Sequence, residues 1–283
     1  DLGAEGWIAE QLRAAAGPLP AAAQAQIDAL SAQQRSPQAL WADIDSARKA
    51  GEAKPTEGER KAAQQAFQQA MTKLARESAQ RHLLRALYAS NQLQERLQGF
   101  WLNHFTVFQF KSNIRVLLAD YEERAIRPHA LGSFRDLLGA CTKHPAMLRY
   151  LDNEQNAAGR INENLARELL ELHTLGVDAG YTQKDVQELA RVLTGHGVNF
   201  SDRTPNLPNE LKAQYQRDGF YEFNPQRHDR GDKAVLGLAV RGRGAAELDE
   251  VLDLLAVHPA TARFVSRKLA RYFLADEPPA ALV

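Results

Sequence analysis

TEGERKAAQQAFQQAMTKL, residues 56–74, is the stretch of this sequence that argues most directly for a fold class. Thr56 and Glu59 stand three residues apart, which is the spacing of a helix-capping box. Three apolar side chains then recur at the period of one helical face, namely Phe67, Met71 and Leu74. The stretch therefore predicts a long amphipathic helix that begins after Thr56.

The rest of the chain favours the same kind of element. Alanine is abundant and β-branched residues are sparse, so the composition favours helix. We expect a mainly α fold, a multi-helical bundle-like domain with a small β-hairpin or loop insert. Further helices are predicted over roughly 112–125, 133–150, 160–175, 182–194, 246–257 and 259–274. The densest apolar stretch, where we expect the core, carries Leu83, Leu84, Leu87, Tyr88, Leu93, Leu97, Phe100, Trp101, Phe105 and Phe108.

Residues 195–244 differ from the rest because prolines and glycines interrupt them. Short β-prone runs at 220–223 and 234–236 predict a β-hairpin insert near 215–240. We expect an N-terminal helical region over 1–95 and a helical core over 96–283 that contains this irregular insert, and we expect the two to form one continuous domain.

Composition excludes several classes of protein. The 35 basic residues balance the 35 acidic residues, so no overall field favours nucleic acid as a partner. No apolar run approaches the ~20 residues that a membrane-spanning helix needs. The single cysteine, Cys141, excludes an internal disulfide. The common metalloprotease, phosphate-loop, nucleophile-elbow and Cys-x-x-Cys motifs are absent, and the sequence leaves the identity of any cofactor unknown.

The segment RINENLARELLELHTLG, residues 160–176, is the best candidate for chemistry. On a regular helix its apolar residues share one face, namely Ile161, Leu165, Leu169, Leu172 and Leu175. Glu168 would lie at the edge of that face and should be half buried, which raises the pKa of a carboxyl group. We therefore expect Glu168 to be a general acid or base, with Arg167, Glu171 and His173 as further candidate catalytic residues.

Two simpler interpretations of this segment stay open. Arg167 is four residues from both Glu163 and Glu171, so these charges can form ordinary surface pairs along a helix. Glu168 and Glu171 have roughly the 5–6 Å separation of a retaining glycosidase pair. However, two side chains on one helix project in parallel and cannot easily flank a sugar from opposite sides.

Other polar residues are candidates for binding. The candidate substrate-binding residues are Trp101, Asn103, Arg127, Asn164, His228 and Asp229. Aromatic residues near Trp101 suit stacking on a sugar or base, although such residues more often belong to a core. We predict no metal site, because no two histidines have ligand spacing, and His104 and His129 are only weak candidate ligands.

Several motifs together resemble the bacterial family of unknown function called DUF1800. The resemblance covers residues 95–274 well and the first 95 weakly. At His196 the family usually has an aromatic residue, so this position departs from the pattern. The motifs are Phe100-Trp101 with Asn103-His104-Phe105; Arg127-Pro128-His129-Ala130-Leu131-Gly132-Ser133-Phe134; His144-Pro145-Ala146-Met147-Leu148 with Leu151-Asp152-Asn153; Asn162 to Gly176; Gly180-Tyr181-Thr182 with Asp185-Val186; Ala190-Arg191 with Leu193-Thr194-Gly195; His228-Asp229 with Gly231, Lys233 and Leu236-Gly237; and His258-Pro259 with Thr261-Ala262 and Phe264.

The resemblance implies a cellular location for the protein but does not indicate which reaction, if any, it catalyses. Family members are often exported, so it implies a periplasmic or extracellular protein of the cell envelope, here similar to a family member cut at both ends. It also implies an exported partner that resembles sulfatase- or phosphatase-like proteins.

Two hypotheses about function follow, and the sequence leaves open whether the protein is an enzyme. The first is a hydrolase or transferase that acts on a glycan or another envelope polymer. In it Glu168 is the acid or base, held by Arg167 or Arg127, and His104, His129 and His173 supply proton transfer or a metal site. The second is a non-catalytic envelope or matrix assembly or binding factor, in which the same polar residues form a buried structural network.

Overall fold

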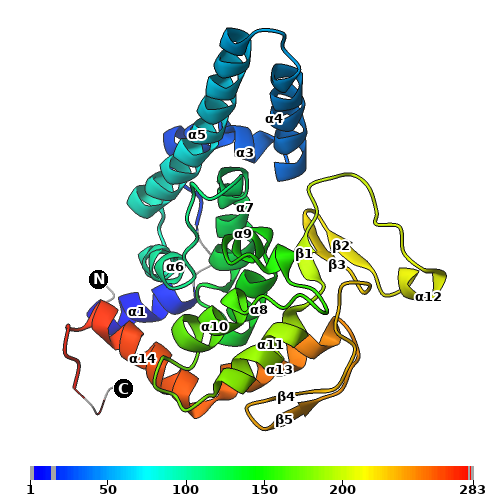
Figure 1. Cartoon of the computed structure of the whole chain (residues 1–283). Coiled ribbons are helices and arrows are strands. Elements are labelled where there is room, and N and C mark those ends of the chain that lie inside the picture. Colours follow the sequence, from blue (N-terminus) through cyan, green and yellow to red (C-terminus); the bar gives the residue numbers. More distant parts are fainter. Residues whose placement is uncertain (1–2, 14–16, 280, 282–283) are drawn as a thin grey trace. The chain divides into compact units, whose positions relative to one another are not determined.

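The computed structural model describes residues 3–13, 17–279 and 281. The chain divides into two compact units, Asp1–Leu131 and Gly132–Val283, and the boundary predicted near residue 95 lies inside the first unit. Helices dominate both units, and the few strands are short and lie between Gly195 and Gly244 (Figure 1). The predicted fold class, mainly α with a small β insert, is confirmed.

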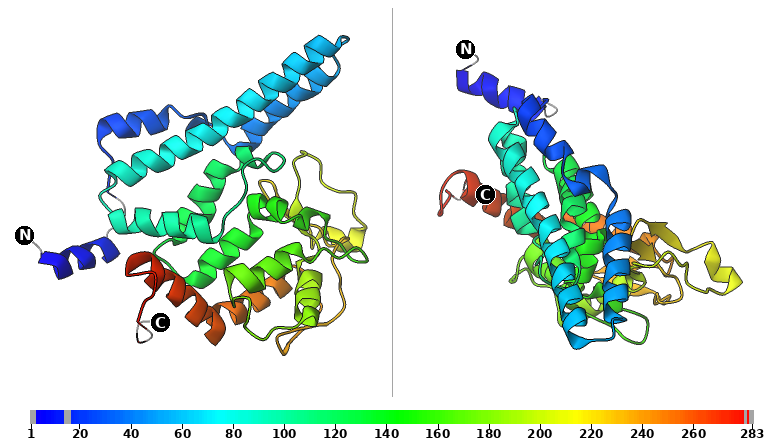
Figure 2. Two further views of the ribbon diagram at one scale, coloured as in Figure 1. Left: turned by 60° about the vertical axis from the view of Figure 1, so that its left-hand side comes forward. Right: turned by 90° about the horizontal axis from the view of Figure 1, so that it is seen from above.

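All regular elements in the described part of the first unit are helices. A hairpin of two long helices, α4 and α5, forms one part of it, and Figures 1 and 2 show the two running side by side. Their backbones approach closely at Gly51, where an added Cβ would lie 2.3 Å from the Cβ of Ala63. Its elements are α1 (Gly3–Arg13), α2 (Ala21–Asp28), α3 (Ser31–Gln34), α4 (Pro37–Glu52), α5 (Glu57–Tyr88), α6 (Gln92–His104), the 3-10 helix η1 (Ile114–Val116), α7 (Leu118–Asp120), the π-helical segment η2 (Tyr121–Ile126) and the 3-10 helix η3 (Arg127–His129).

The predicted long helix is confirmed as α5. Thr56 accepts a hydrogen bond from the backbone N–H of Glu59, and the Glu59 carboxylate accepts one from the backbone of Thr56, so the capping box is formed. Met71 and Leu74 are buried, as the spacing predicted. The predicted helix over 112–125 is instead three short pieces of different helix type, η1, α7 and η2.

The predicted core stretch is only partly right. Phe100, Trp101 and Phe105 are buried, but Leu83 and Leu87 are 58% and 61% exposed. Tyr88 and Phe108 are exposed as well. Leu83 and Leu87 lie on the other side of α5, because its buried positions Ser78, Arg81 and Leu84 continue the face of Met71 and Leu74.

In the second unit, helices pack around a separate hydrophobic core. Its helices are α8 (Phe134–Lys143), α9 (Pro145–Tyr150), the 3-10 helix η4 (Asn153–Gln155), α10 (Asn164–Glu168), the π-helical segment η5 (Leu169–His173), α11 (Gln183–Leu193), α12 (Asn209–Lys212), α13 (Ala246–Val257) and α14 (Pro259–Phe273). Fully buried side chains include Leu137, Leu138, Met147, Leu148 and Phe223. The single helix predicted over 133–150 is broken at His144, because Pro145 has no N–H with which to continue α8.

The insert forms two small antiparallel sheets. In the first, β3 (Tyr221–Phe223) lies between β1 (His196–Val198) and β2 (Gln216–Asp218), with His196 opposite Phe223. In the second, β4 (Lys233–Val235) pairs with β5 (Leu238–Val240). The two-residue turn between them has positive φ at both Leu236 and Gly237, the conformation that matches the twist of a hairpin. The predicted hairpin insert is thus confirmed as a pair of small sheets.

None of the helices in the described ranges combines the length with the apolar composition that crossing a bilayer requires.

Candidate functional site

The segment that carries Glu168 is not one regular helix. α10 begins where the Asn162 side chain accepts the backbone N–H of Asn164 at 3.0 Å. After five residues the backbone widens into the π-helical segment η5, and the Thr174 hydroxyl donates to the carbonyl of Leu169 at 2.6 Å. The segment ends at Gly176, whose φ of +91° suits glycine and whose N–H donates to Leu170.

The wide turn changes which residues are buried. Leu165, Leu169 and Leu175 are buried as predicted. Ile161 is 39% exposed because it precedes the helix, and Leu172 is 48% exposed because the π turn rotates it away from the helical face. The predicted apolar face was therefore wrong at its first and fourth positions. Such wide turns occur frequently at functional sites.

Glu168 is half buried, as predicted. Its carboxylate forms no hydrogen bond and no ion pair with any residue in the described ranges. Burial raises the pKa of this carboxyl group, and the charge of Glu171 raises it further, whereas the charge of Arg167 lowers it. Four described carboxyl groups in this unit show the opposite shift, with lowered pKa values at Asp185, Asp229, Glu247 and Asp249.

The residues around Glu168 form ion pairs and hydrogen bonds with one another. Arg167 lies 3.1 Å from a carboxylate oxygen of Glu163 and 3.4 Å from one of Glu171, so the predicted surface pairs are formed. It also donates to the side chain of Gln183 at 2.9 Å. Burial raises the pKa of Tyr181 to about 12, and its hydrogen bond to Glu171 contributes to the same shift. Arg167 thus acts on Glu168 through its charge, without a direct bond.

The two remaining candidates of this segment have opposite environments. His173 is buried at the end of η5, whereas Asn164 is exposed at the start of α10. Both lie in the second unit together with Glu168.

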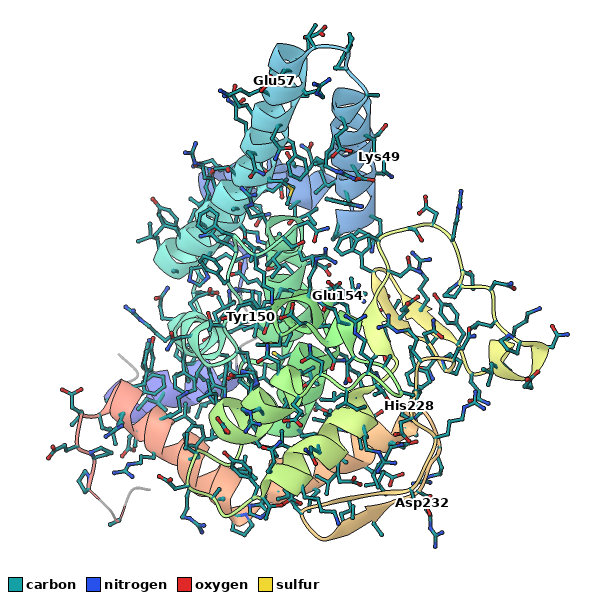
Figure 3. All side chains as sticks on the ribbon, viewed as in Figure 1. Lys49, Glu57, Tyr150, Glu154, His228 and Asp232 are labelled. Atoms are coloured by element: carbon teal, nitrogen blue, oxygen red, sulfur yellow. The ribbon has the colours of Figure 1, made fainter. Side chains whose placement is uncertain are left out.

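The side chains of His228 and Asp229 bond to other residues of the second unit. His228 Nδ1 donates to the carbonyl of Thr194 at 2.7 Å, and its Nε2 lies 2.9 Å from Glu247 Oε1. Lys233 Nζ lies 2.6 Å from the other oxygen of Glu247, and the side chains of all three residues are at most 1% exposed. Figure 3 shows His228 inside the unit, whereas Asp232, four residues later, is at its outer edge. Asp229 pairs with Arg191 at 2.9 Å.

The charges of this buried group stabilise one another. Burial alone would raise the pKa of Glu247, but hydrogen bonds from His228 and Lys233 outweigh it and lower that pKa. The backbone N–H groups of Arg243 and Gly244 also donate to Glu247, each at 2.7 Å. The arrangement ties β4 to the first turn of α13. Sequence reasoning missed Glu247, since no local pattern marks it as a partner of His228.

The other predicted residues lie in the first unit. Trp101 is buried and donates its indole N–H to the carbonyl of Ala130 at 3.1 Å. His104 is buried edge-on between the rings of Trp101 and Phe105. Asn103 is exposed and His129 is partly exposed. The predicted convergence of these residues with the Glu168 segment stays a prediction.

Arg127 belongs to a polar network that the sequence did not reveal. It pairs with Glu95 at 2.6 Å and donates to Gln98 at 2.6 Å. Gln98 donates in turn to Glu122, whose carboxylate also lies 2.8 Å from His82 Nδ1. The hydrogen bond with Glu122 raises the pKa of His82. His82 and Glu122 are 40 residues apart, so no spacing rule could have joined them.

In the ranges that the structure describes, no group of three or more histidine, cysteine, aspartate or glutamate side chains is arranged to hold a metal ion. The only cysteine, Cys141, is buried.

The fold and these contacts define a class of helical protein in which polar motif residues bond to one another in the interior. Among the residues that the structure describes, Glu168 is the one half-buried acid without a partner. The chain belongs to the family described as protein of unknown function (DUF1800), whose model matches residues 1–283. The match therefore includes the first 95 residues, where the motif resemblance was weak. Neither a curated protein nor a solved structure matches the chain.

Proposed function

We propose that the protein is a hydrolase or transferase that acts on a glycan or another polymer of the cell envelope, with Glu168 as its general acid. The observation that carries this proposal is the state of the Glu168 carboxyl group, which is half buried, has a raised pKa and has no partner among the described residues. A carboxyl group of this kind retains its proton to higher pH and can donate it to a leaving oxygen.

The surroundings of Glu168 support this role. Glu171 lies within electrostatic range and is itself bonded by Arg167 and Tyr181, so it is held as a fixed neighbour. Because Glu168 and Glu171 project from the same turn, they do not flank a sugar ring as a glycosidase pair does. The proposal therefore assigns proton donation to Glu168 and assigns no nucleophile.

The test is a comparison of two conservative substitutions in the full chain. Glu168→Gln should reduce the release of new chain ends from purified envelope polysaccharides by about a hundredfold or more, because the amide cannot donate a proton as an acid. Glu163→Gln is the matched control, since Glu163 is on the same segment but is paired with Arg167. If Glu168→Gln retains full activity in a preparation that is active without the substitution, the assignment of Glu168 is wrong.

A second candidate function is a non-catalytic assembly or binding factor of the envelope. It is favoured by the internal bonds of Arg127, His228 and Asp229, which were expected to meet a substrate. Under this function the bonded polar residues are structural, so Arg127→Ala should lower the melting temperature sharply and no added polymer should restore it. A melting temperature that stays unchanged speaks against this second function.

We propose an exported location and an exported sulfatase- or phosphatase-like partner on the family resemblance alone. Fractionation of the source cells followed by immunoblotting tests the location. Isolation of the native protein followed by identification of co-purified proteins tests the partner.

A further inference from the structure

The first unit contains a cavity that is separate from Glu168. Its volume is about 360 Å³, within the range of small-molecule sites. Its walls come from α5, from α6 and the residues that follow it, and from α7 and η2. Alanine, leucine and valine side chains make up much of the wall. Its polar lining residues include Ser78, His82, Thr106, Gln109 and Glu122.

His82 is a prepared hydrogen-bonding group in this wall. Its Nδ1 lies 2.8 Å from the carboxylate of Glu122, whose side chain is only 4% exposed. Gln98 donates to the same carboxylate oxygen, which fixes the position of the acceptor. Because the carboxylate accepts the Nδ1 proton, the other ring nitrogen, Nε2, is available, and it bonds to no described residue. The side chain of His82 is 34% exposed, so a ligand can reach it.

Three uncharged polar side chains line the same cavity. Ser78, Thr106 and Gln109 form no side-chain hydrogen bond within the described ranges. Their two hydroxyl groups and one amide can both donate and accept. Together with His82 they provide several hydrogen-bonding groups of mixed direction within one small space.

An exposed aromatic ring completes the wall. Phe108 lines the cavity and is 56% exposed. It meets the ring of Phe110 edge to face, with 5.6 Å between the centroids, and Phe110 is 60% exposed. An accessible ring beside several hydroxyl and amide groups suits a ligand with an apolar face and a polar rim.

The charges near the cavity favour a neutral ligand. Glu122 is bonded by His82 and Gln98. Arg81 donates to the carbonyl of Ala119 at 2.6 Å and lies 3.6 Å from Glu122. Both charges are thus already paired, and an ionic ligand would have to displace a buried partner.

We propose that this cavity binds one neutral sugar unit of a polysaccharide. The apolar face of the sugar ring lies on Phe108, and its hydroxyl groups bond to His82 Nε2 and to Ser78, Thr106 and Gln109. This inference goes beyond the proposed function, because it names a polymer class and a binding site whose described lining residues do not include Glu168.

The test is saturation-transfer NMR and titration calorimetry on the full chain. The probes are five neutral tetrasaccharides (cello-, malto-, laminari-, manno- and chitotetraose) and one anionic probe, tetragalacturonate. We expect at least one neutral probe to bind. Phe108→Ala and Gln109→Ala should each weaken that binding by about tenfold, since each removes one contact to the ring. Phe273→Ala is the matched control, because Phe273 is also exposed and lies in the second unit.

Three outcomes would overturn the inference: no neutral probe binds, only tetragalacturonate binds, or Phe108→Ala binds as the unsubstituted protein does. Both cavity substitutions are at accessible side chains outside the Glu122 network, so loss of folding does not confuse the result. Binding that survives Glu168→Gln separates this site from the proposed activity, and either one can fail without the other.

Discussion

Two charged neighbours shift the pKa of Glu168 in opposite directions. The charge of Glu171 raises the pKa of this carboxyl group and the charge of Arg167 lowers it, while burial makes the largest contribution. A general acid must be protonated to act, so its pKa sets the upper pH limit of activity.

Glu171→Gln should therefore move the upper pH limit of activity to lower pH. The substitution removes a negative charge, so Glu168 loses its proton more easily. Arg167→Gln should move the same limit to higher pH, because it removes a positive charge. The measurement is the pH profile of kcat/KM for the unsubstituted protein and for each of the two variants. Shifts in the same direction for both substitutions would contradict the role of Glu168.

The burial of His196 should make the folded state less stable at acid pH. It is 1% exposed, its Nδ1 lies 2.9 Å from the hydroxyl of Tyr221, and no described residue bonds to its Nε2. Burial lowers the pKa of His196 to about 3. In the unfolded chain the same histidine takes up a proton near pH 6.5, so the folded state loses stability as the pH falls from 6.5 towards 3.

Between about pH 7.5 and pH 5 this single group should reduce the free energy of unfolding by roughly 2 kcal/mol. His196→Phe replaces the imidazole with an aromatic ring that does not take up a proton, and it should remove that loss. Urea denaturation of both proteins at the two pH values measures the difference. An equal loss in His196→Phe would show that other groups cause the acid sensitivity.

At the scale of elements, η5 and the insert show how particular side-chain and backbone hydrogen bonds override helical or strand periodicity. The π turn at Leu169–His173 is closed by Thr174 and by the left-handed backbone of Gly176. The hairpin β4–β5 is held to α13 by a buried triad of His228, Lys233 and Glu247. Neither arrangement follows from helical or strand periodicity.

Lys233→Met should destabilise the second unit by about 3–5 kcal/mol. The substitution removes a buried cation and leaves the Glu247 carboxylate with less compensation at 0% exposure. The control is Arg241→Gln, in the same insert, whose pair with Asp232 is 3.4 Å long and largely exposed. That control should change the free energy of unfolding by at most about 1 kcal/mol. Chemical denaturation followed by circular dichroism compares them, and equal effects would contradict the structural role of the triad.

At the scale of the whole molecule, each unit encloses its own buried side chains. Met71 is fully buried in the unit that ends at Leu131, and Leu252 is fully buried in the unit that begins at Gly132. Separate cores allow separate unfolding transitions.

Calorimetry of the full chain should therefore show two transitions. Met71→Ala should lower one of them and Leu252→Ala the other, each by the equivalent of about 2–5 kcal/mol, because each leaves a cavity in one core. A single transition that both substitutions lower equally would show that the chain unfolds as one cooperative domain.

Much of the fold could be predicted from the sequence because helices are stabilised by near neighbours. The capping boxes at Thr56–Glu59 and Thr182–Asp185 form between residues three apart, and Pro259 is the first residue of α14, where the N–H that proline lacks would have no helical partner. The glycine- and proline-rich insert was also visible as a break in helical pattern. Glu168 was correctly expected to be half buried, since its position at the edge of an apolar face survived the change in helix type.

By itself, the amino-acid sequence determined that the protein is helical, where several of its helices begin and which family it belongs to, because these follow from local bonding and from motif residues. Tertiary structure alone decided which polar residues far apart in the sequence became partners. It joined His82 to Glu122 and His228 to Glu247, and it left Glu168 without a partner among the described residues. The physical reason is that burial and long-range hydrogen bonds, which set the pKa of a carboxyl group or an imidazole, depend on segments that meet only in the folded chain.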